Sequence, residues 1–226
     1  MKISCVCPTR QERRHFLPQV VECFLSQTYA DKELVILDEA ASSWQGEFPH
    51  PEPSVHYHFI PDTGARMTTG RKRNAVNELT TGEIIAHFDD DDWSHPDRLQ
   101  SQFDTLFRAN VDLVGYHDIL YYRVNDRSLW KYMYQGRPQP YATGTSQMYF
   151  KAAWRSHPFV HRVVGEDSEF SFDFCRRGRL FSEEGKKMIV AYAHASNSYV
   201  PNFGNAPFLK AERADFSEEF LRHVRL

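Results

Sequence analysis

The chain has 226 residues, of which 41% are hydrophobic and 25% are charged, a composition typical of a soluble globular protein with one core. Its 27 Lys and Arg residues nearly balance 30 Asp and Glu residues, so the formal charge of −3 gives no argument for a dedicated binder of nucleic acids or anionic membranes. No apolar run approaches the roughly 18 residues that span a bilayer, and the N-terminus lacks a signal-peptide pattern. We therefore expect one domain, residues 1–226, in the cytoplasm, and the composition leaves a homo-oligomer open.

The first forty residues show the pattern of strand, helix and strand. Residues 3–7 form a short apolar run that we expect Pro8 to end. Apolar side chains then recur every fourth residue from Phe16 to Leu25, as on the buried face of a helix. Residues 34–37 are continuously apolar, which is typical of a strand covered on both faces in a parallel sheet. A βαβ unit is therefore predicted at the start of the chain.

A loop, a strand, a helix and another strand follow. Residues 42–53 contain three prolines and no periodicity, which predicts a surface loop before the alternating strand 55–59. Residues 70–81 have a helical pattern that we expect Gly82 to end. Residues 83–88 form an apolar strand that runs directly into four aspartates. The alternation of strands and helices indicates the α/β class.

The second half mixes β-segments with helices. A helix is expected to start at residues 94–97, and residues 112–116 resume a strand. From Ile119 the pattern becomes aromatic-rich and β-like, with a hairpin turn expected at Asn125–Asp126. The remaining predicted elements are a strand at 146–151, a helix at 167–177 closed by Gly178, a strand at 188–193, and a polar tail after Asn202 that we expect to be partly mobile.

The cysteines lie in segments that otherwise appear apolar. They are Cys5, Cys7, Cys23 and Cys175, which are few for this length and favour reduced thiols. The spacing of Cys5 and Cys7 lacks the two-residue gap of common metal pairs. We therefore interpret them as small buried residues.

The aspartates that follow the strand 83–88 are the strongest chemical signal. They are Asp89, Asp90, Asp91 and Asp92, and their mutual repulsion calls for a positive partner. In open α/β sheets ligands bind beyond the carboxyl ends of the strands, where carboxylates suit a divalent cation that carries substrate phosphates. Mg²⁺ or Mn²⁺ bridging a diphosphate is the direct interpretation, and a solvated acidic loop is the alternative.

A basic group stands at the start of the helix predicted for residues 70–81. It consists of Arg71, Lys72 and Arg73, in a chain without an overall positive excess. The amides at a helix N-terminus also attract anions, so a phosphate partner fits both the charges and their position. Ordinary surface charges on an exposed helix are the alternative.

The order of several motifs carries more information than any one of them. The segments are Ile3–Thr9, Phe24–Tyr29, Glu33–Asp38, Arg73-Asn74, Gly82-Glu83 and Asp89–Trp93, followed by Pro96 and Leu99. In this order and spacing they resemble the GT-A glycosyltransferases of the family 2 type, which use nucleotide-diphosphate sugars. The resemblance implies a Rossmann-like, mostly parallel central sheet flanked by helices. It also implies a nucleotide-sugar-binding half at 1–118 and a mixed, aromatic-rich acceptor-binding half at 119–226.

Beyond Leu99 the resemblance rests on shorter segments. Gly144–Phe150 resembles the segment that borders the acceptor side of the pocket, and Gly165–Phe170 resembles the Glu-Asp motif that supplies the catalytic base. His194, with Asn197 three residues later, resembles a late histidine that can complete a metal site. Taken alone, acids at a helix start and a histidine at a strand end are also ordinary structural features.

Carried over residue by residue, the resemblance implies a set of roles. Those implied are nucleotide-sugar binding by Thr9, Asp38, Arg71, Arg73, Asp89 and Asp90, Mn²⁺ or Mg²⁺ binding by Asp91 and His194, and general-base catalysis by Asp167. The implied reaction is inverting transfer of a sugar from a UDP-sugar to an acceptor hydroxyl. A glycan, a lipid-linked sugar, a protein and a nucleic-acid base remain open as acceptors.

Two other functions fit part of the pattern. A nucleotidyltransferase acting on a sugar phosphate would also place carboxylates and a metal at strand ends, but residues 8–13 lack the glycine-rich loop that we would expect there. A non-catalytic nucleotide-sugar-binding module would lack the base, yet Asp167 is present. The aromatic residues after Ile119 are interpreted mainly as core rather than as sugar-stacking surfaces.

Overall fold

The computed structural model describes residues 1–44, 48, 52–135, 139–185, 187–197, 199 and 201–226, so the loop predicted at 42–53 lies partly outside the described residues. The strands are β1 (Ile3–Arg10), β2 (Lys32–Ala40), β3 (Val55–Pro61), β4 (Ile84–His87), β5 (Trp93–Ser94), β6 (Leu113–Arg123), β7 (Ser128–Tyr132), β8 (Met148–Phe150), β9 (Leu180–Glu184), β10 (Ile189–Ala193) and β11 (Phe208–Lys210). The helices are α1 (Leu17–Leu25), α2 (Thr69–Leu79), α3 (Arg98–Arg108), α4 (Lys151–Ser156), α5 (Glu166–Arg176) and α6 (Glu218–His223), with 3-10 turns η1 (Gln11–Phe16), η2 (Gly144–Ser146) and η3 (Arg213–Asp215).

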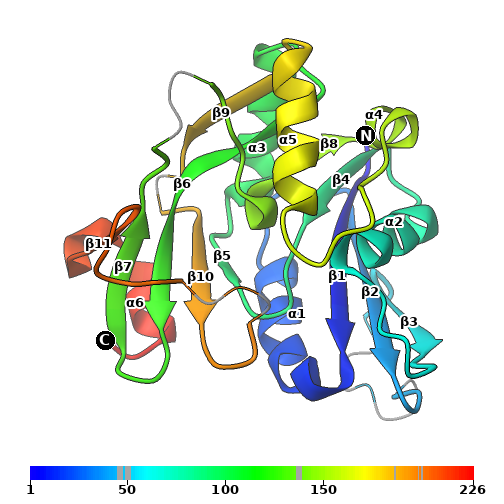
Figure 1. Cartoon of the computed structure of the whole chain (residues 1–226), viewed down its shortest axis with the longest axis horizontal. Helices are drawn as coiled ribbons and strands as arrows, with labels where there is room; N and C mark the ends of the chain where they lie inside the picture. Colours follow the sequence, from blue (N-terminus) through cyan, green and yellow to red (C-terminus); the bar gives the residue numbers. More distant parts are fainter. Residues whose placement is uncertain (45–47, 49–51, 136–138, 186, 198, 200) are drawn as a thin grey trace.

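The strands of the described residues join in the order β11-β7-β6-β8-β4-β1-β2-β3, and β9 and β10 also pair with β6 (Figure 1). β1 pairs in parallel with β2 on one side and with β4 on the other, and β2 pairs in parallel with β3. The predicted βαβ start is therefore confirmed. Because β1 and β4 are parallel neighbours, the aspartates that follow β4 emerge beside the end of β1.

β1 continues through Pro8, which we expected to end it. The Val6 carbonyl accepts a hydrogen bond from the Phe88 amide at 2.9 Å, so the backbone groups of Val6 point toward β4. Pro8, two residues further along the strand, points the same way, but β4 has ended at His87. The missing N–H of Pro8 therefore removes no ladder hydrogen bond, and pairing with β2 continues to Arg10.

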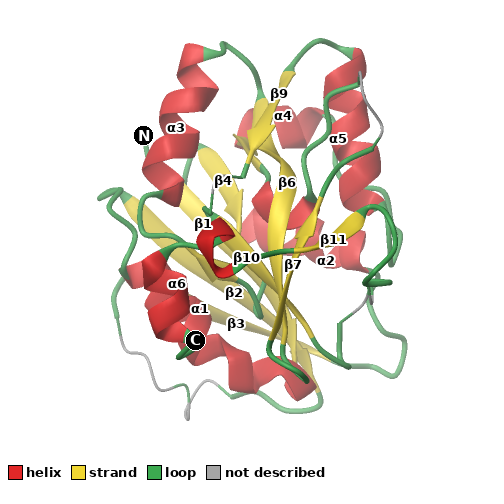
Figure 2. Ribbon diagram, turned by 90° about the vertical axis from the view of Figure 1, so that its left-hand side faces the viewer, coloured by secondary structure: helices red, strands yellow, loops and turns green. Residues whose placement is uncertain are grey.

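Helices cover both faces of the sheet (Figure 2). Alternate residues of β1 face opposite sides. Ile3 and Cys5 pack in the core beneath α1 and α3, whereas Val6 packs in the core beneath α2 and α5. Cys5 and Cys7 are buried free thiols, as predicted. None of the helices in the described ranges is long and apolar enough to cross a membrane.

β6 belongs to both halves of the chain. Its first residues, Leu113 and Val114, pair with β8 and β9. At its other end, residues 119–123 pair with β7 on one side, and residues 120–123 pair with β10 on the other. The hairpin predicted at Asn125–Asp126 joins β6 to β7. The boundary that we placed after residue 118 therefore falls inside one strand, at the point where its partners change.

The ends of two other predicted elements differ in the structure. α2 ends at Leu79, and Gly82 serves a close approach instead, because a Cβ there would lie 2.6 Å from the Lys2 carbonyl oxygen. The tail after Asn202 is built into the fold, since β11 pairs with β7 and Phe220 of α6 is fully buried. Each of these tail elements is too short to produce a periodic pattern, so the polar composition was a misleading signal.

A buried arginine ties the end of β4 to the elements around it. Arg98 is 1% exposed, and its Nη2 donates to the carbonyl oxygens of His87 and Thr145, both at 2.8 Å. Its Nη1 donates to the Ser94 hydroxyl at 2.9 Å, and its Nε donates to the Gln102 side chain at 3.0 Å. One guanidinium thus connects β4, β5, α3 and the η2 turn.

Arg98→Met should lower the free energy of unfolding by at least about 3 kcal/mol. Charge-assisted hydrogen bonds contribute roughly 1.5–3 kcal/mol each, and the substitution also leaves buried carbonyl groups unpaired. Urea denaturation followed by tryptophan fluorescence measures the loss. Arg108→Met, on the exposed face of the same helix, is the control and should change stability by less than about 0.5 kcal/mol. A loss below about 1 kcal/mol for Arg98→Met would contradict this role.

Candidate functional site

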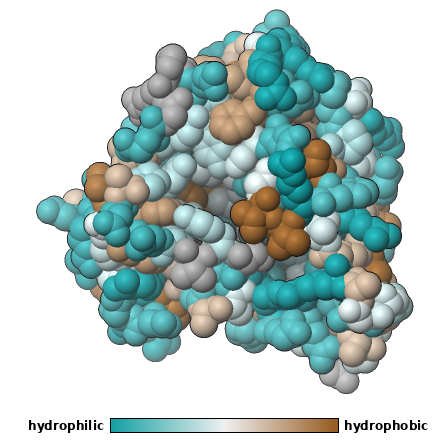
Figure 3. Space-filling view, in the orientation of Figure 1, coloured by the Kyte–Doolittle hydropathy of each residue, from teal (hydrophilic) through white to brown (hydrophobic). Residues whose placement is uncertain are grey.

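A cavity of about 760 Å³ lies where the ends of β1 and β4 meet the second half of the sheet. The face seen in Figure 1 is hollowed near its middle, between hydrophilic and hydrophobic side chains (Figure 3). Acidic and basic side chains from the first half of the chain line part of this cavity. Tyrosines and the start of α5 from the second half line another part.

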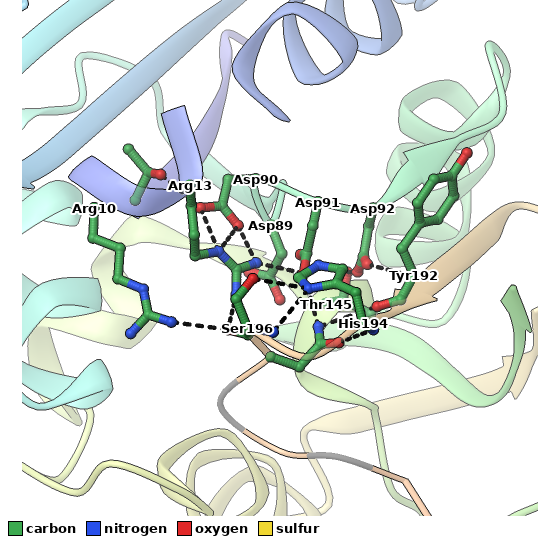
Figure 4. Close-up of polar contacts among 12 residues, drawn as sticks. Arg10, Arg13, Asp89, Asp90, Asp91, Asp92, Thr145, Tyr192, His194 and Ser196 are labelled. Atoms are coloured by element: carbon green, nitrogen blue, oxygen red, sulfur yellow. Dashed lines mark hydrogen bonds and ion pairs between the residues drawn. The ribbon is translucent and has the colours of Figure 1, made fainter. Parts of the chain in front are cut away.

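Asp90 is held by the end of β1 and by the turn that follows it. Its Oδ2 accepts a hydrogen bond from the Thr9 hydroxyl at 2.6 Å, and both carboxylate oxygens accept from Arg13 Nε at 2.9–3.0 Å (Figure 4). Burial and the adjacent charge of Asp91 raise the pKa of Asp90 to about 7, and the Arg13 cation opposes this shift. Thr9 and Asp90, both predicted site residues, therefore line the cavity as a bonded pair.

The structure brings Asp91 and His194 together, although 103 residues separate them in the sequence. His194 Nε2 lies 2.9 Å from Asp91 Oδ2, and Asn197 Nδ2 donates to the same oxygen at 2.8 Å. Arg13 Nη2 also contacts this oxygen. Burial alone would raise the pKa of Asp91, but the hydrogen bond from His194 and the charge of Arg13 lower it. Asp91 is therefore an anion that faces the cavity.

The donor types of Asp91 and His194 fit a divalent cation. A carboxylate oxygen and an imidazole nitrogen both bind Mn²⁺, and a carboxylate suits Mg²⁺. Within the described ranges, no cluster of three or more His, Cys, Asp or Glu side chains is arranged to hold a metal. The two side chains would therefore supply only part of a coordination shell, as is usual where substrate phosphates and water supply the rest.

Arg73 joins the acidic segment to α5. Its Nη2 lies 3.2 Å from Asp89 Oδ1, and its Nε donates to Glu166 Oε1 at 3.2 Å. Burial opposes the charged form of Arg73, but Asp89 and Glu166 raise its pKa, so it stays a cation. Arg73 and Asp89, both predicted to bind the nucleotide sugar, thus line the cavity together with Asp167, the predicted general base.

The basic group at the start of α2 is only partly directed into the cavity. Arg71 is exposed and does not line it, so a role of Arg71 in donor binding stays a prediction. Lys72 lines the cavity instead, with Nζ 2.7 Å from Glu39 and 3.1 Å from the Thr9 carbonyl oxygen. Consecutive helix residues are about 100° apart around the axis, so three in a row cannot face one side.

Asp167 lies in the first turn of α5 and lines the cavity. Its Oδ1 accepts from the Ser168 amide at 2.8 Å, and its backbone carbonyl accepts from Gln147 Nε2 at 3.0 Å. Gly144 packs directly against it, because a Cβ on Gly144 would lie 2.1 Å from Asp167 Oδ2. The carboxylate is thus positioned by two segments, η2 and α5.

Asp38 is fully buried at the end of β2 and does not line the cavity. Its Oδ2 accepts from Arg14 Nε at 2.7 Å and from the Tyr57 hydroxyl at 2.5 Å. Its Oδ1 is buried without a hydrogen-bond partner in the part of the chain that the structure describes. A direct contact of Asp38 with a nucleotide base would need Arg14 or Tyr57 to move, and it stays a prediction.

Arg13 and a group of tyrosines were not identified from the sequence. Arg13 lies among ordinary charged residues, and no spacing marks it. The tyrosines that line the cavity are Tyr121, Tyr132, Tyr141, Tyr192 and Tyr199, whereas Trp93, Trp130 and Trp154 do not line it. We expected most aromatic residues to form core. The signal that separates the cavity tyrosines from the core aromatic residues is strand pairing, which places Tyr121 and Tyr132 on neighbouring strands.

Comparisons with known proteins agree with this architecture. A family model described as glycosyl transferase family 2 matches residues 4–163. Glucosyl-dolichyl phosphate glucuronosyltransferase of Haloferax volcanii is 33% identical over 120 residues, which cover 51% of this chain and 37% of that protein. The putative colanic acid biosynthesis glycosyl transferase WcaA of Escherichia coli is 27% identical over 205 residues, which cover 84% of this chain and 67% of that protein.

Two solved structures show the same fold at low sequence identity. S. aureus TarS 1–349 in complex with UDP-GlcNAc has a TM-score of 0.67 and 16% identity, over 88% of this chain and 60% of that one. The mannosyltransferase PcManGT from Pyrobaculum calidifontis, in complex with GDP-Man and Mn²⁺, has a TM-score of 0.63 and 16% identity, over 84% and 56%. The predicted GT-A fold is confirmed. The chain spans about a third of the first curated relative and about two thirds of the second.

Proposed function

The chain belongs to glycosyl transferase family 2, and we propose that it transfers a sugar from a nucleotide-diphosphate donor to an acceptor hydroxyl. One observation carries the proposal: a single cavity is lined by Asp91, by the cations Lys72 and Arg73, and by the carboxylate of Asp167. A departing diphosphate needs cations, and an attacking hydroxyl needs a base. The pair Asp91 and His194 adds a place for a divalent cation.

We propose a UDP-sugar as the donor. Thr9 and Asp38 stand at the carboxyl ends of β1 and β2, the edge at which α/β sheets bind nucleotides. The TarS complex contains UDP-GlcNAc and the PcManGT complex contains GDP-Man, so both bases occur with this fold. Asp38 Oδ1 would accept an N–H group of the base once Arg14 or Tyr57 moves aside.

Mn²⁺ or Mg²⁺ would be held by Asp91 and His194 together with diphosphate oxygens. Such a cation, when bound, offsets the negative charge of the leaving diphosphate. Arg73 and Lys72 supply further positive charge from the start of α2. Asp89 keeps Arg73 in place, and we assign Asp90, beside Thr9, to the ribose.

Asp167 would act as the general base in a single displacement. Its carboxylate accepts the acceptor's proton while the acceptor oxygen forms a bond to the anomeric carbon of the sugar. The bond from that carbon to the diphosphate oxygen breaks, and its electron pair leaves with the nucleoside diphosphate. Because the attack and the departure are in line, the configuration at the anomeric carbon inverts.

The acceptor would bind on the tyrosine side of the cavity. Tyr141 lies close to Asp167, the proposed general base. Its hydroxyl is 3.4 Å from the hydroxyl of Ser168, the next residue after Asp167. Tyr199 is 57% exposed at the cavity rim, where an incoming molecule can reach it. A tyrosine offers an aromatic face and a hydroxyl, which suits a ring that presents both C–H and O–H groups.

An assay with UDP- and GDP-sugars, using water and simple glycosides as acceptors, tests donor and metal together. We expect nucleoside diphosphate release from a UDP-sugar with Mn²⁺, and a loss of about 10²-fold or more after chelation or in Asp91→Asn, because charge on the leaving group is no longer offset. Asp104→Asn, an exposed aspartate on α3, is the control and should keep the parental rate. Full activity with chelator would refute metal dependence, GDP-sugar preference would refute the uridine assignment, and no release from any donor would refute the transferase.

Asp167→Asn should separate binding from chemistry. The amide keeps the shape of the side chain but removes the basic oxygen, so transfer should fall by roughly 10²- to 10⁴-fold. Calorimetry with UDP should show donor-site affinity within about twofold of the parent. NMR of the parental product should show the opposite anomer to the donor. A retained anomer, or parental turnover in the variant, would exclude this role.

Gly144→Ala should slow transfer by displacing Asp167. The new Cβ would lie 2.1 Å from Asp167 Oδ2 and 2.9 Å from Asp167 Cβ, so the carboxylate must turn away and the contact between η2 and α5 must widen slightly. We expect a loss of about tenfold or more. The double variant Gly144→Ala/Asp167→Asn should be no slower than Asp167→Asn alone, because both changes act on one group. Additive losses would show that Gly144 serves another purpose.

A further inference from the structure

Arg13 occupies the space between the carboxylates of Asp90 and Asp91. It lies in η1, directly after β1, and only 8% of it is exposed. Its Nε donates to both oxygens of Asp90, and its Nη2 contacts both Asp90 and Asp91 (Figure 4). Its Nη1 donates to the Ser196 carbonyl oxygen at 3.1 Å. The guanidinium is therefore the counter-ion of the two acidic residues.

A divalent cation held by both Asp91 and His194 would lie at Asp91 Oδ2, the oxygen that faces His194, and Arg13 contacts that same oxygen. Asp91 Oδ2 is the atom reached by His194 Nε2, by Asn197 and by Arg13 Nη2. A metal ion binds a carboxylate oxygen at about 2.0–2.2 Å, so at Asp91 Oδ2 it would stand beside the guanidinium, with a single oxygen shared by the two positive charges. Their repulsion makes the two arrangements mutually exclusive.

We propose that Arg13 must leave Asp91 before Mn²⁺ or Mg²⁺ binds there, and that the donor's diphosphate draws it away. The inference rests on the proposed function, in which Asp91 holds the cation. Arg13 lines the cavity, so a diphosphate in it would offer the guanidinium a new anionic partner. The nucleotide then removes the competitor of the metal, and the two ligands bind cooperatively.

Arg10 provides a matched control. It also lines the cavity, and its Nη2 donates to the same Ser196 carbonyl oxygen at 2.8 Å. Its ion pair is with Glu12, at 3.6 Å, rather than with the acidic segment. Replacing Arg10 therefore changes the charge of the cavity without releasing Asp90 or Asp91.

Calorimetric titration of Mn²⁺, with and without saturating UDP, tests the proposal without an activity assay. Arg13→Gln should bind Mn²⁺ alone about tenfold more tightly than the parent. UDP should tighten Mn²⁺ binding to both proteins, because the diphosphate oxygens also ligate the cation, but the factor should be about tenfold larger for the parent than for Arg13→Gln. Arg10→Gln should resemble the parent in both titrations. Thermal melts check folding, and Mn²⁺ should raise the midpoint of Arg13→Gln more than that of the parent.

Arg13→Lys extends the test to a variant that keeps the positive charge. Lysine lacks the fixed fork with which a guanidinium bridges two carboxylates. The Mn²⁺ affinity of Arg13→Lys should therefore lie between those of the parent and Arg13→Gln. If Arg13→Gln does not fold, this comparison decides the question. Equal or weaker Mn²⁺ binding in the folded variants overturns the role of Arg13 while leaving the metal site intact. No Mn²⁺ binding to any protein, even with UDP, overturns the metal assignment itself and this inference with it.

Discussion

Four consecutive carboxylates at the end of β4 must be stabilised before the rest of this site can exist. Their partners are Arg73 for Asp89, Thr9 and Arg13 for Asp90, Arg13, His194 and Asn197 for Asp91, and the Thr145 hydroxyl and Tyr192 amide for Asp92. These partners come from β1, η1, α2, η2, β10 and the loop after β10. The acidic segment therefore determines where elements from both halves of the chain meet, and the cavity forms at that meeting point.

The four aspartates differ because their surroundings differ. Burial and the charges of Asp91 and Asp89 raise the pKa of Asp92 well above its usual range, and its oxygens accept bonds from Thr145 and a backbone amide. Asp92 therefore holds β10 and η2 against the acidic segment. Asp91 stays anionic beside three cationic or hydrogen-bonding partners, which keeps it suited to a ligand. Four consecutive aspartates thus include one that stabilises the fold, Asp92, and one that is suited to binding a ligand, Asp91.

Apolar patterns that repeat along the sequence predicted strands and helices, whereas features that depend on contacts between distant segments were missed. Apolar periodicity was sufficient for β1, β2 and α1, since burial on one or both faces leaves a regular pattern. The end of β1 at Pro8 was wrong because the tolerance for proline depends on where the neighbouring strand β4 stops. The choice between Arg71 and Lys72 depends on the rotation of α2, and the contacts of Arg13 depend on side chains 77 residues or more away. Neither the rotation of a helix nor a contact with a distant side chain leaves a pattern in the spacing of neighbouring residues.

The distance between the predicted base and the donor side is set by the packing of α2 against the segment before α5. Gly70 of α2 lies so close to the Val160 carbonyl oxygen that a Cβ there would approach it to 1.9 Å, and its amide bonds the Arg162 carbonyl oxygen at 3.0 Å. Arg73, on the same helix, pairs with Glu166, the neighbour of Asp167. A single displacement requires the base, the anomeric carbon and the leaving group to be held in line, which rigid elements do better than loops. In the proposed mechanism, the helix that would present cations to the diphosphate would therefore also position the carboxylate of Asp167.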